Sequence, residues 1–187
     1  MKIKEIIKNA AIILGLSDVV EVIQSGTKTQ RLNNINFRVL LRASNLVVAN
    51  LAANFTELTQ KVEINFTDGR IQLSDFPSPF VRIIRVRELG RDIDFRLFID
   101  HVALTSRQGS GIVEVEYAYL PTVKDGEECN PFPLPAAALE YGILSEYAFI
   151  SGMFNEAQVW RAKLAELLFA TKRKDGRSIT MPQGLRG

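Results

Sequence analysis

The spacing of apolar residues changes twice along the chain, and this change most strongly limits how the chain can fold. Before residue 54, and again from Pro135 to about Thr171, apolar residues recur every three or four positions, as on one face of a helix. Between Lys61 and Lys124 they alternate with polar residues, as in half-buried strands. We therefore expect an α+β fold: a helical bundle of N- and C-terminal helices with an inserted antiparallel β module and an extended C-terminal tail.

The N-terminal part predicts three helices. The first covers residues 2–14 and ends at Gly15, and Ser17 is expected to cap a short second helix to about Ile23. After a loop over residues 25–29, a long helix is expected from about Gln30 to Ala53. This part makes up the first predicted segment, residues 1–60.

Three arginines are expected on the exposed side of the long helix. Arg31, Arg38 and Arg42 are spaced i, i+7 and i+11, so on one continuous helix they share a face. This face is either solvated or a contact for DNA or for an acidic strip on an adjoining subunit. The sequence leaves both interpretations open.

The inserted β module is predicted over residues 61–124. Expected strands cover residues 62–66, 70–73, 80–87, 93–99, 101–106 and 112–120. The Asp68-Gly69 pair predicts a tight hairpin turn between the first two. The last strand alternates cleanly, so it is expected to bury one face and to expose Glu114 and Glu116 on the other.

The chain returns to helix after a proline-rich segment, in a predicted third segment over residues 125–171. Pro131, Pro133 and Pro135 exclude helix before Pro135, which suits the first position of a helix. Asn155, with Gln158 three residues on, is expected to cap a second helix that ends near Thr171.

The last predicted segment, residues 172–187, is a basic tail with spaced apolar residues. A disordered end and a segment that docks into a partner are both compatible with it, and the apolar residues favour docking, because such segments order on binding. The residues expected to dock are Lys172, Arg173, Lys174, Arg177, Ile179, Met181, Leu185 and Arg186.

Charge and composition narrow the classes of function. The net charge is only +2, but residues 170–187 hold five Lys/Arg against one Asp, whereas residues 121–169 hold three against seven acids. Such segregation favours separate partner surfaces over a general nucleic-acid binder.

One cysteine and one histidine offer neither a disulfide framework nor metal-ligand spacing, and we expect no cofactor. Without a signal peptide or an apolar run of roughly 18 residues, we expect a soluble protein made in a reducing cytoplasm, with no membrane partner.

No residue pattern favours catalysis. Ser25 and Lys28 have the spacing of a nucleophile pair but lie in a Gly/Thr loop, and Asp92, Asp94 and Asp100 alternate with arginines as ordinary strand and turn charges do. His101 is expected to be a strand or edge residue, and Cys129 has no histidine near it in sequence. A glycine-rich phosphate loop is also missing from the sequence. We expect a protein that is not an enzyme.

The C-terminal third resembles a known family. Leu134-Pro135-Ala136-Ala137-Ala138-Leu139-Glu140-Tyr141-Gly142, followed by Phe149, Met153-Phe154-Asn155-Glu156-Ala157 and the amphipathic run to Lys172, is similar to the head-to-tail adaptors of short-tailed bacteriophages, the family of tail tubular protein A. The architecture is similar over nearly the whole chain, and the motif over about forty residues.

The resemblance implies a structural virion protein, made in the host bacterial cytoplasm, that forms a ring, typically twelve-fold, beneath the portal protein. Helices and tail would bind the portal, the β module would face the tail nozzle protein or neighbouring subunits, and genomic DNA would pass through the central channel. Two alternatives stay open: a stand-alone nucleic-acid-binding or regulatory protein that uses the basic long helix, and a small enzyme of unknown type.

Overall fold

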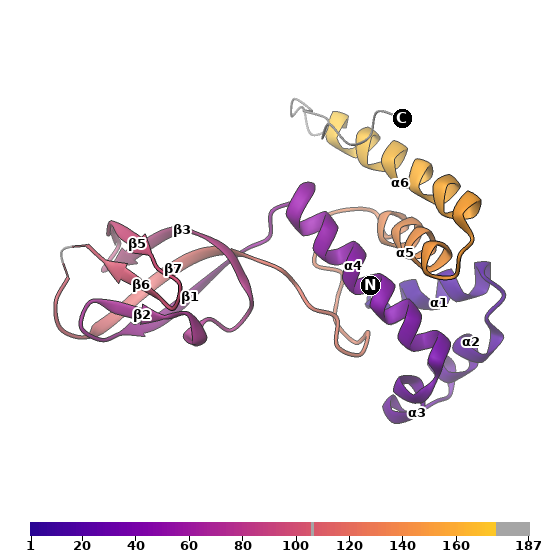
Figure 1. Cartoon of the computed structure of the whole chain (residues 1–187), viewed down its shortest axis with the longest axis horizontal. Coiled ribbons are helices and arrows are strands. Elements are labelled where there is room, and N and C mark those ends of the chain that lie inside the picture. Colours follow the sequence, from indigo (N-terminus) through magenta and orange to yellow (C-terminus); the bar gives the residue numbers. More distant parts are fainter. Residues whose placement is uncertain (106, 175–187) are drawn as a thin grey trace. The chain divides into compact units, whose positions relative to one another are not determined.

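The computed structural model describes residues 1–105 and 107–174, and its architecture confirms the α+β class (Figure 1). The chain divides into two compact units. The helical unit consists of Met1–Val48 with Val123–Gly187, and the β unit is Ala49–Thr122. The first boundary lies inside a helix, α4, rather than at the predicted residue 61. Each unit is described by itself below.

The helical unit packs around α5 (Ala136–Ile150). This helix contacts α1 (Ile3–Ile13) on one side and the antiparallel α6 (Phe154–Lys174) on another. Two shorter helices, α2 (Ser17–Gln24) and α3 (Lys28–Asn33), follow α1 and lead to α4 (Ile35–Asn54). The largest fully buried side chains of this unit are apolar residues spaced three or four apart: Ile3, Ile6, Ile7, Val19, Phe37, Leu40, Leu139, Ile143 and Leu144.

The prediction of one long helix over residues 30–53 is wrong at its N-terminal end. Two capping residues, Thr27 and Asn34, start two separate helices there. Thr27 forms a capping box with Gln30 at the start of α3. Asn34 then leaves the helical conformation, and its Oδ1 accepts a hydrogen bond of 2.8 Å from the Phe37 amide at the start of α4. The other two predicted caps, Ser17 and Asn155, instead lie within the first turns of α2 and α6.

The β unit holds two antiparallel sheets (Figure 1). One has the strand order β1-β7-β3-β4 and the other β2-β6-β5. A short 3-10 turn, η1 (Leu73–Asp75), follows the second strand. The strands are β1 (Thr59–Phe66), β2 (Arg70–Gln72), β3 (Phe80–Glu88), β4 (Arg91–Asp92), β5 (Phe95–Leu97), β6 (His101–Leu104) and β7 (Gly111–Tyr119).

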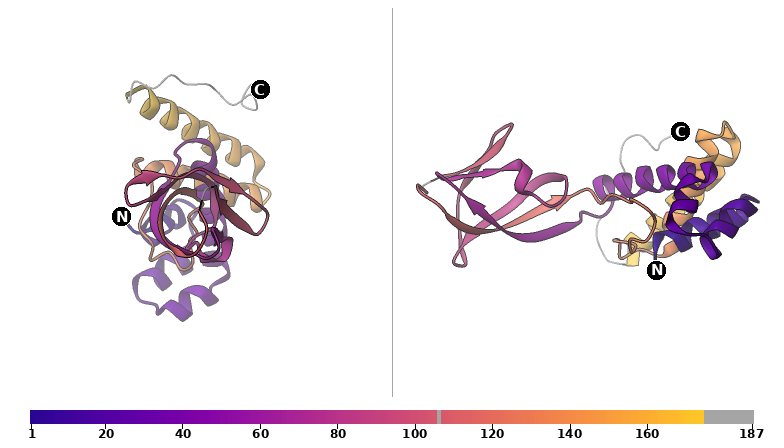
Figure 2. Two further views of the ribbon diagram at one scale, coloured as in Figure 1. Left: turned by 90° about the vertical axis from the view of Figure 1, so that its left-hand side faces the viewer. Right: turned by 90° about the horizontal axis from the view of Figure 1, so that it is seen from below.

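A core shared by both sheets holds the β unit together. In the left-hand view of Figure 2 its strands curve around a common interior. β7 supplies Val113, Val115 and Tyr117 to this interior, while Glu114 and Glu116 point away from it, as the alternation predicted. Buried residues from the other strands complete the core: Ile64, Phe66, Ile71, Val86, Val102 and Leu104.

Strand pairing differs from the prediction in two places. The Asp68-Gly69 turn forms, and both residues have positive φ, but only the bridge Thr67↔Arg70 closes it before β2 joins the other sheet. The strand predicted over residues 93–99 shrinks to β5, because Phe98 N–H donates to the His101 carbonyl in a turn. The turn between β3 and β4 is formed by Leu89 and Gly90.

The predicted tail is partly helical. α6 continues through Lys174, so Lys172, Arg173 and Lys174 form the end of a helix and not the start of an extended segment. Arg177, Ile179, Met181, Leu185 and Arg186 lie outside the described residues, and their docking role stays a prediction.

Candidate interaction surfaces

Arg31 is buried in an ion-pair cluster and does not share an exposed face with Arg38 and Arg42. It lies on α3 and is 7% exposed. Its Nη2 donates to Glu127 Oε1 at 2.8 Å, and its Nη1 donates to the Gly26 carbonyl at 3.3 Å. The prediction of a three-arginine face is therefore wrong, because the break at Asn34 puts Arg31 on a different helix.

Glu127 is the centre of this cluster. Besides Arg31, it accepts from Lys4 Nζ at 2.8 Å and from Lys2 Nζ at 2.9 Å. The hydrogen bonds from Lys4 and then Lys2 lower the pKa of Glu127 from 4.5 to about 2. The backbone supports the same contact, since the Ile3 and Lys4 amides donate to the Glu128 and Gly126 carbonyls. The cluster thus ties the start of the chain and α3 to the segment that follows the β unit.

An exposed stripe runs along the first part of α4. We call Ile35, Arg38, Arg42 and Leu46 the α4 face; they are spaced three, four and four residues apart and so lie on one side of the helix. Ile35 is 64% exposed and Leu46 is 46% exposed. Among the described residues neither arginine has an ion-pair partner, and the sequence of α4 contains no Asp or Glu.

An apolar groove with an acidic rim lies between α1 and α2. Its volume is about 360 Å³, and Ile12, Leu16 and Val20 line it with Glu21 and Gln24. No basic residue is among its described lining residues. Asp18 lies one turn before Glu21, and hydrogen bonds from Asn34 and then Asn36 lower its pKa, which keeps this carboxylate charged. We call this set the α1–α2 groove.

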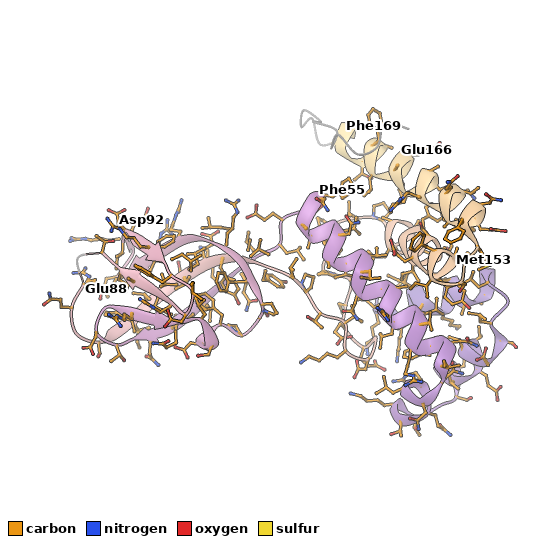
Figure 3. The ribbon with its side chains drawn as sticks, in the orientation of Figure 1. Phe55, Glu88, Asp92, Met153, Glu166 and Phe169 are labelled. Carbon is orange, nitrogen blue, oxygen red and sulfur yellow. The ribbon has the colours of Figure 1, made fainter. Side chains whose placement is uncertain are left out.

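The α5–α6 hairpin exposes two phenylalanines beside a second pocket of about 270 Å³. Phe149 and Phe154 are 61% and 59% exposed, and their rings pack edge to face at 5.6 Å. Figure 3 labels Met153 in the loop that joins the two helices. Glu146 and Arg161 also line this pocket, so its charges are mixed.

Two turns of the β unit expose large apolar side chains. Leu89 is 99% exposed in the β3–β4 turn, between Glu88 and Asp92, which Figure 3 labels. In the β5–β6 turn Ile99 is 100% exposed, and Leu97 and Phe98 are about half exposed. Contiguous exposed apolar side chains of this size are typical of protein interfaces.

The residues considered for catalysis have ordinary structural contacts. Asp92 pairs across the strands with Arg87 at 2.8 Å. His101 stacks on Phe98 and hydrogen-bonds Asp100 at 2.7 Å, which lowers the pKa of Asp100. Ser25 donates to the Glu21 carbonyl, while Lys28 pairs with Asp125.

The two remaining residues considered for catalysis are Asp94 and Cys129. Asp94 accepts the Thr105 amide through its backbone carbonyl, and the Cys129 side chain is exposed. Within residues 1–105 and 107–174, no group of three or more His, Cys, Asp or Glu side chains is arranged to hold a metal ion.

Sequence reasoning missed Glu127 and the α1–α2 groove. The acidic run Asp125 to Glu128, directly after the alternating segment, is a signal that could have directed attention to the first feature. The groove has no comparable signal, because its residues come from two separate helices and the turn between them.

No protein-family model matches this chain, and no curated protein matches it. In the part of the chain that the structure describes, none of the helices combines the length and the apolar character needed to cross a bilayer.

Proposed function

We propose that the protein is a structural subunit of a bacteriophage head-to-tail adaptor, a ring that joins the portal protein to the tail nozzle protein and lines the DNA exit channel. The observation that carries this proposal is the presence of several separate exposed surfaces on one small chain. The α5–α6 hairpin, the α4 face and the two β-unit turns each expose large apolar or unpaired charged side chains. A subunit with several neighbours needs such surfaces.

Two further features support the proposal. The β unit is inserted between helices, as the resemblance of residues 134–172 to the adaptor family implies. Exposed basic residues occur on α4, and the sequence after Thr171 is basic, whereas Glu140 and Glu146 are the only charged residues of α5. In this proposal the end of α6 and the residues that follow it bind the portal, and the β unit contacts the tail.

Electron microscopy of the protein mixed with the portal protein of the same phage tests the proposal. The expected result is a ring of added density on one end of the portal. Deletion of residues 172–187 should leave melting unchanged and weaken co-sedimentation with the portal. A full-length chain that neither sediments with the portal nor forms a ring would contradict the proposal.

A second candidate, nucleic-acid binding by the helical unit, is favoured only by Arg38 and Arg42. Two phosphate contacts give a slope of log affinity against log salt of about −2, far below that of proteins with six to ten contacts. Measurable binding of duplex DNA in fluorescence anisotropy, with a salt slope that falls by about 2 in Arg38→Ala/Arg42→Ala, would favour this candidate instead.

A further inference from the structure

The strongest unexplained feature of the helical unit is a pair of oppositely charged surfaces, on which Arg38, Arg42 and Glu21 have no ion-pair partner among the described residues. The α4 face carries Arg38 and Arg42 between exposed Ile35 and Leu46. The α1–α2 groove carries Glu21 beside an apolar floor, while Asp18 accepts hydrogen bonds from Asn34 and Asn36 of its own chain. Each surface therefore combines apolar side chains with charges of a single sign.

The α4 face is somewhat longer than the side of the groove that α2 forms. From Ile35 to Leu46 the α4 face extends about 16 Å, and α2, which forms one side of the groove, is about 12 Å long. About three quarters of the α4 face can therefore lie along α2, with Arg42 opposite Glu21.

We infer that the α1–α2 groove binds the α4 face of a second copy of this chain. Arg42 of one copy pairs with Glu21 of the next, while Ile35 and Leu46 cover Ile12, Leu16 and Val20. The two surfaces are different, so the contact is heterologous, and each copy keeps one free surface of each kind. Repetition of such a contact produces a closed ring or an open filament.

This inference rests on the proposed function and gives it a specific subunit contact. It also assigns the unpaired arginines to protein rather than to DNA. Since an interfacial charge pair adds specificity as well as affinity, reversal of one charge is expected to block association with the unchanged neighbour.

Charge reversal with a compensating change tests the pairing. Arg42→Glu or Glu21→Arg alone should raise the dissociation constant of self-association by roughly thirtyfold in sedimentation velocity runs. The chain that carries both changes should regain most of the lost affinity. As a matched control, Glu156→Arg reverses an exposed charge on α6, away from both surfaces, and should leave association unchanged. Equal losses in the control and test variants would overturn the inference.

Cross-linking separates a heterologous contact from a two-fold one. Cys129 is the only cysteine, so Cys129→Ser provides a cysteine-free background. With a short bismaleimide, Arg42→Cys combined with Glu21→Cys in one chain should give a ladder of covalent oligomers, and a mixture of the two single variants should give dimers only. Either single variant by itself should stay monomeric.

The outcomes also separate this inference from the proposed function. Cross-linked dimers of a single variant would overturn the inference, because like surfaces would then meet. Rings on the portal without any Arg42–Glu21 cross-link would overturn the inference and leave the adaptor function intact. Only a chain that forms no ring with the portal contradicts the function.

Discussion

Glu127 is the residue on which the helical unit's polar contacts converge. Its carboxylate accepts hydrogen bonds from Lys2, Lys4 and the buried Arg31. Loss of its charge leaves the guanidinium group of Arg31 buried without a counter-ion, a change that destabilises proteins strongly. Glu127 is itself partly exposed, so water weakens each of its contacts.

We expect Glu127→Gln to lower the stability of the helical unit in a pH-dependent manner. The folded-state pKa of Glu127 is about 2 and its ordinary value is 4.5, so the carboxylate stabilises the fold fully above about pH 4.5. This contribution declines as the pH falls from 4.5 to 2. Urea unfolding followed by the fluorescence of Trp160 should therefore show a constant difference between variant and wild type from pH 5 to 8, and a shrinking one below.

The control for this prediction is Glu156→Gln, which neutralises an exposed carboxylate at the start of α6. It should change stability little at any pH. A difference between Glu127→Gln and wild type that persists undiminished at pH 2 would show that the amide disrupts packing rather than removing a charge.

Leu89 combines two unfavourable properties, full exposure and a left-handed backbone. Its φ is 49° and that of Gly90 is 78°, so the pair forms the two-residue turn between Glu88 and Arg91 in which Asn-Gly is preferred. A residue with a branched aliphatic side chain costs roughly 1–2 kcal/mol in this conformation. Backbone strain of this kind is often retained where a residue has a function.

Leu89→Asn is expected to stabilise the β unit by about 1 kcal/mol, because asparagine tolerates the left-handed region. Hydrogen exchange of the β3 and β7 amides measures this local stability. Leu97→Asn is the matched control, since Leu97 is exposed without a positive φ and should give no gain. If Leu89 belongs to a tail-binding surface, the stabilised variant should bind the tail protein less tightly.

At the scale of elements, the approach of α5 to α4 depends on one glycine. A Cβ atom at position 142 would lie 2.5 Å from Val47 Cγ1, closer than real contacts allow. Alanine favours helix over glycine by roughly 1 kcal/mol, but overpacking a core costs about 1–3 kcal/mol, and valine's stiff χ1 leaves it little room to move. The steric effect should therefore win.

Gly142→Ala is expected to destabilise the helical unit by about 1 kcal/mol, measured by urea unfolding with Trp160 fluorescence. Val47→Ala also destabilises, since it removes buried methyl groups. The double variant should cost less than the sum of the two single changes, because Val47→Ala makes space for the new Cβ. Strict additivity would show that the two side chains do not compete for this space.

At the scale of the whole molecule, the β unit joins the chain through neighbouring strand ends. Thr59 of β1 lies opposite Ala118 of β7, and such antiparallel neighbours have Cα atoms about 5 Å apart. A short linker can therefore join the two ends where the chain enters and leaves the strands. This geometry allows the β unit to be removed without pulling the helices apart.

Replacement of residues 58–120 by a Gly/Ser linker of about four residues is expected to give a soluble helical protein that still binds the portal but does not recruit the nozzle. Circular dichroism and Trp160 fluorescence check the fold, and co-sedimentation checks both partners. Retained nozzle binding with lost portal binding would reverse the assigned roles of the two units. An insoluble product would mean that the strands complete the helical core.

Much of the fold could be predicted because its signals are local. The apolar spacing of α1 and α5 and the alternation of β7 arise from helix and strand geometry, and the structure confirms α1, β7 and the start of α5 within one or two residues. The errors occurred where two local signals compete. Asn34 suits an exposed position on a helix as well as a cap, and its side chain bonds the Phe37 amide only because the chain turns there.

The candidate surfaces were harder to predict, because they depend on contacts between distant residues. The side chain of Arg31 can be buried because it pairs with Glu127, which is 96 residues further along the chain. No rule of local spacing connects two positions this far apart. β2 leaves the Asp68-Gly69 hairpin because pairing with β6 buries Ile71. The sequence by itself determined the α+β class and most elements, which follow from periodicity. The tertiary structure alone decided strand partners and which charges stay exposed, because burial and pairing depend on what the rest of the chain brings together.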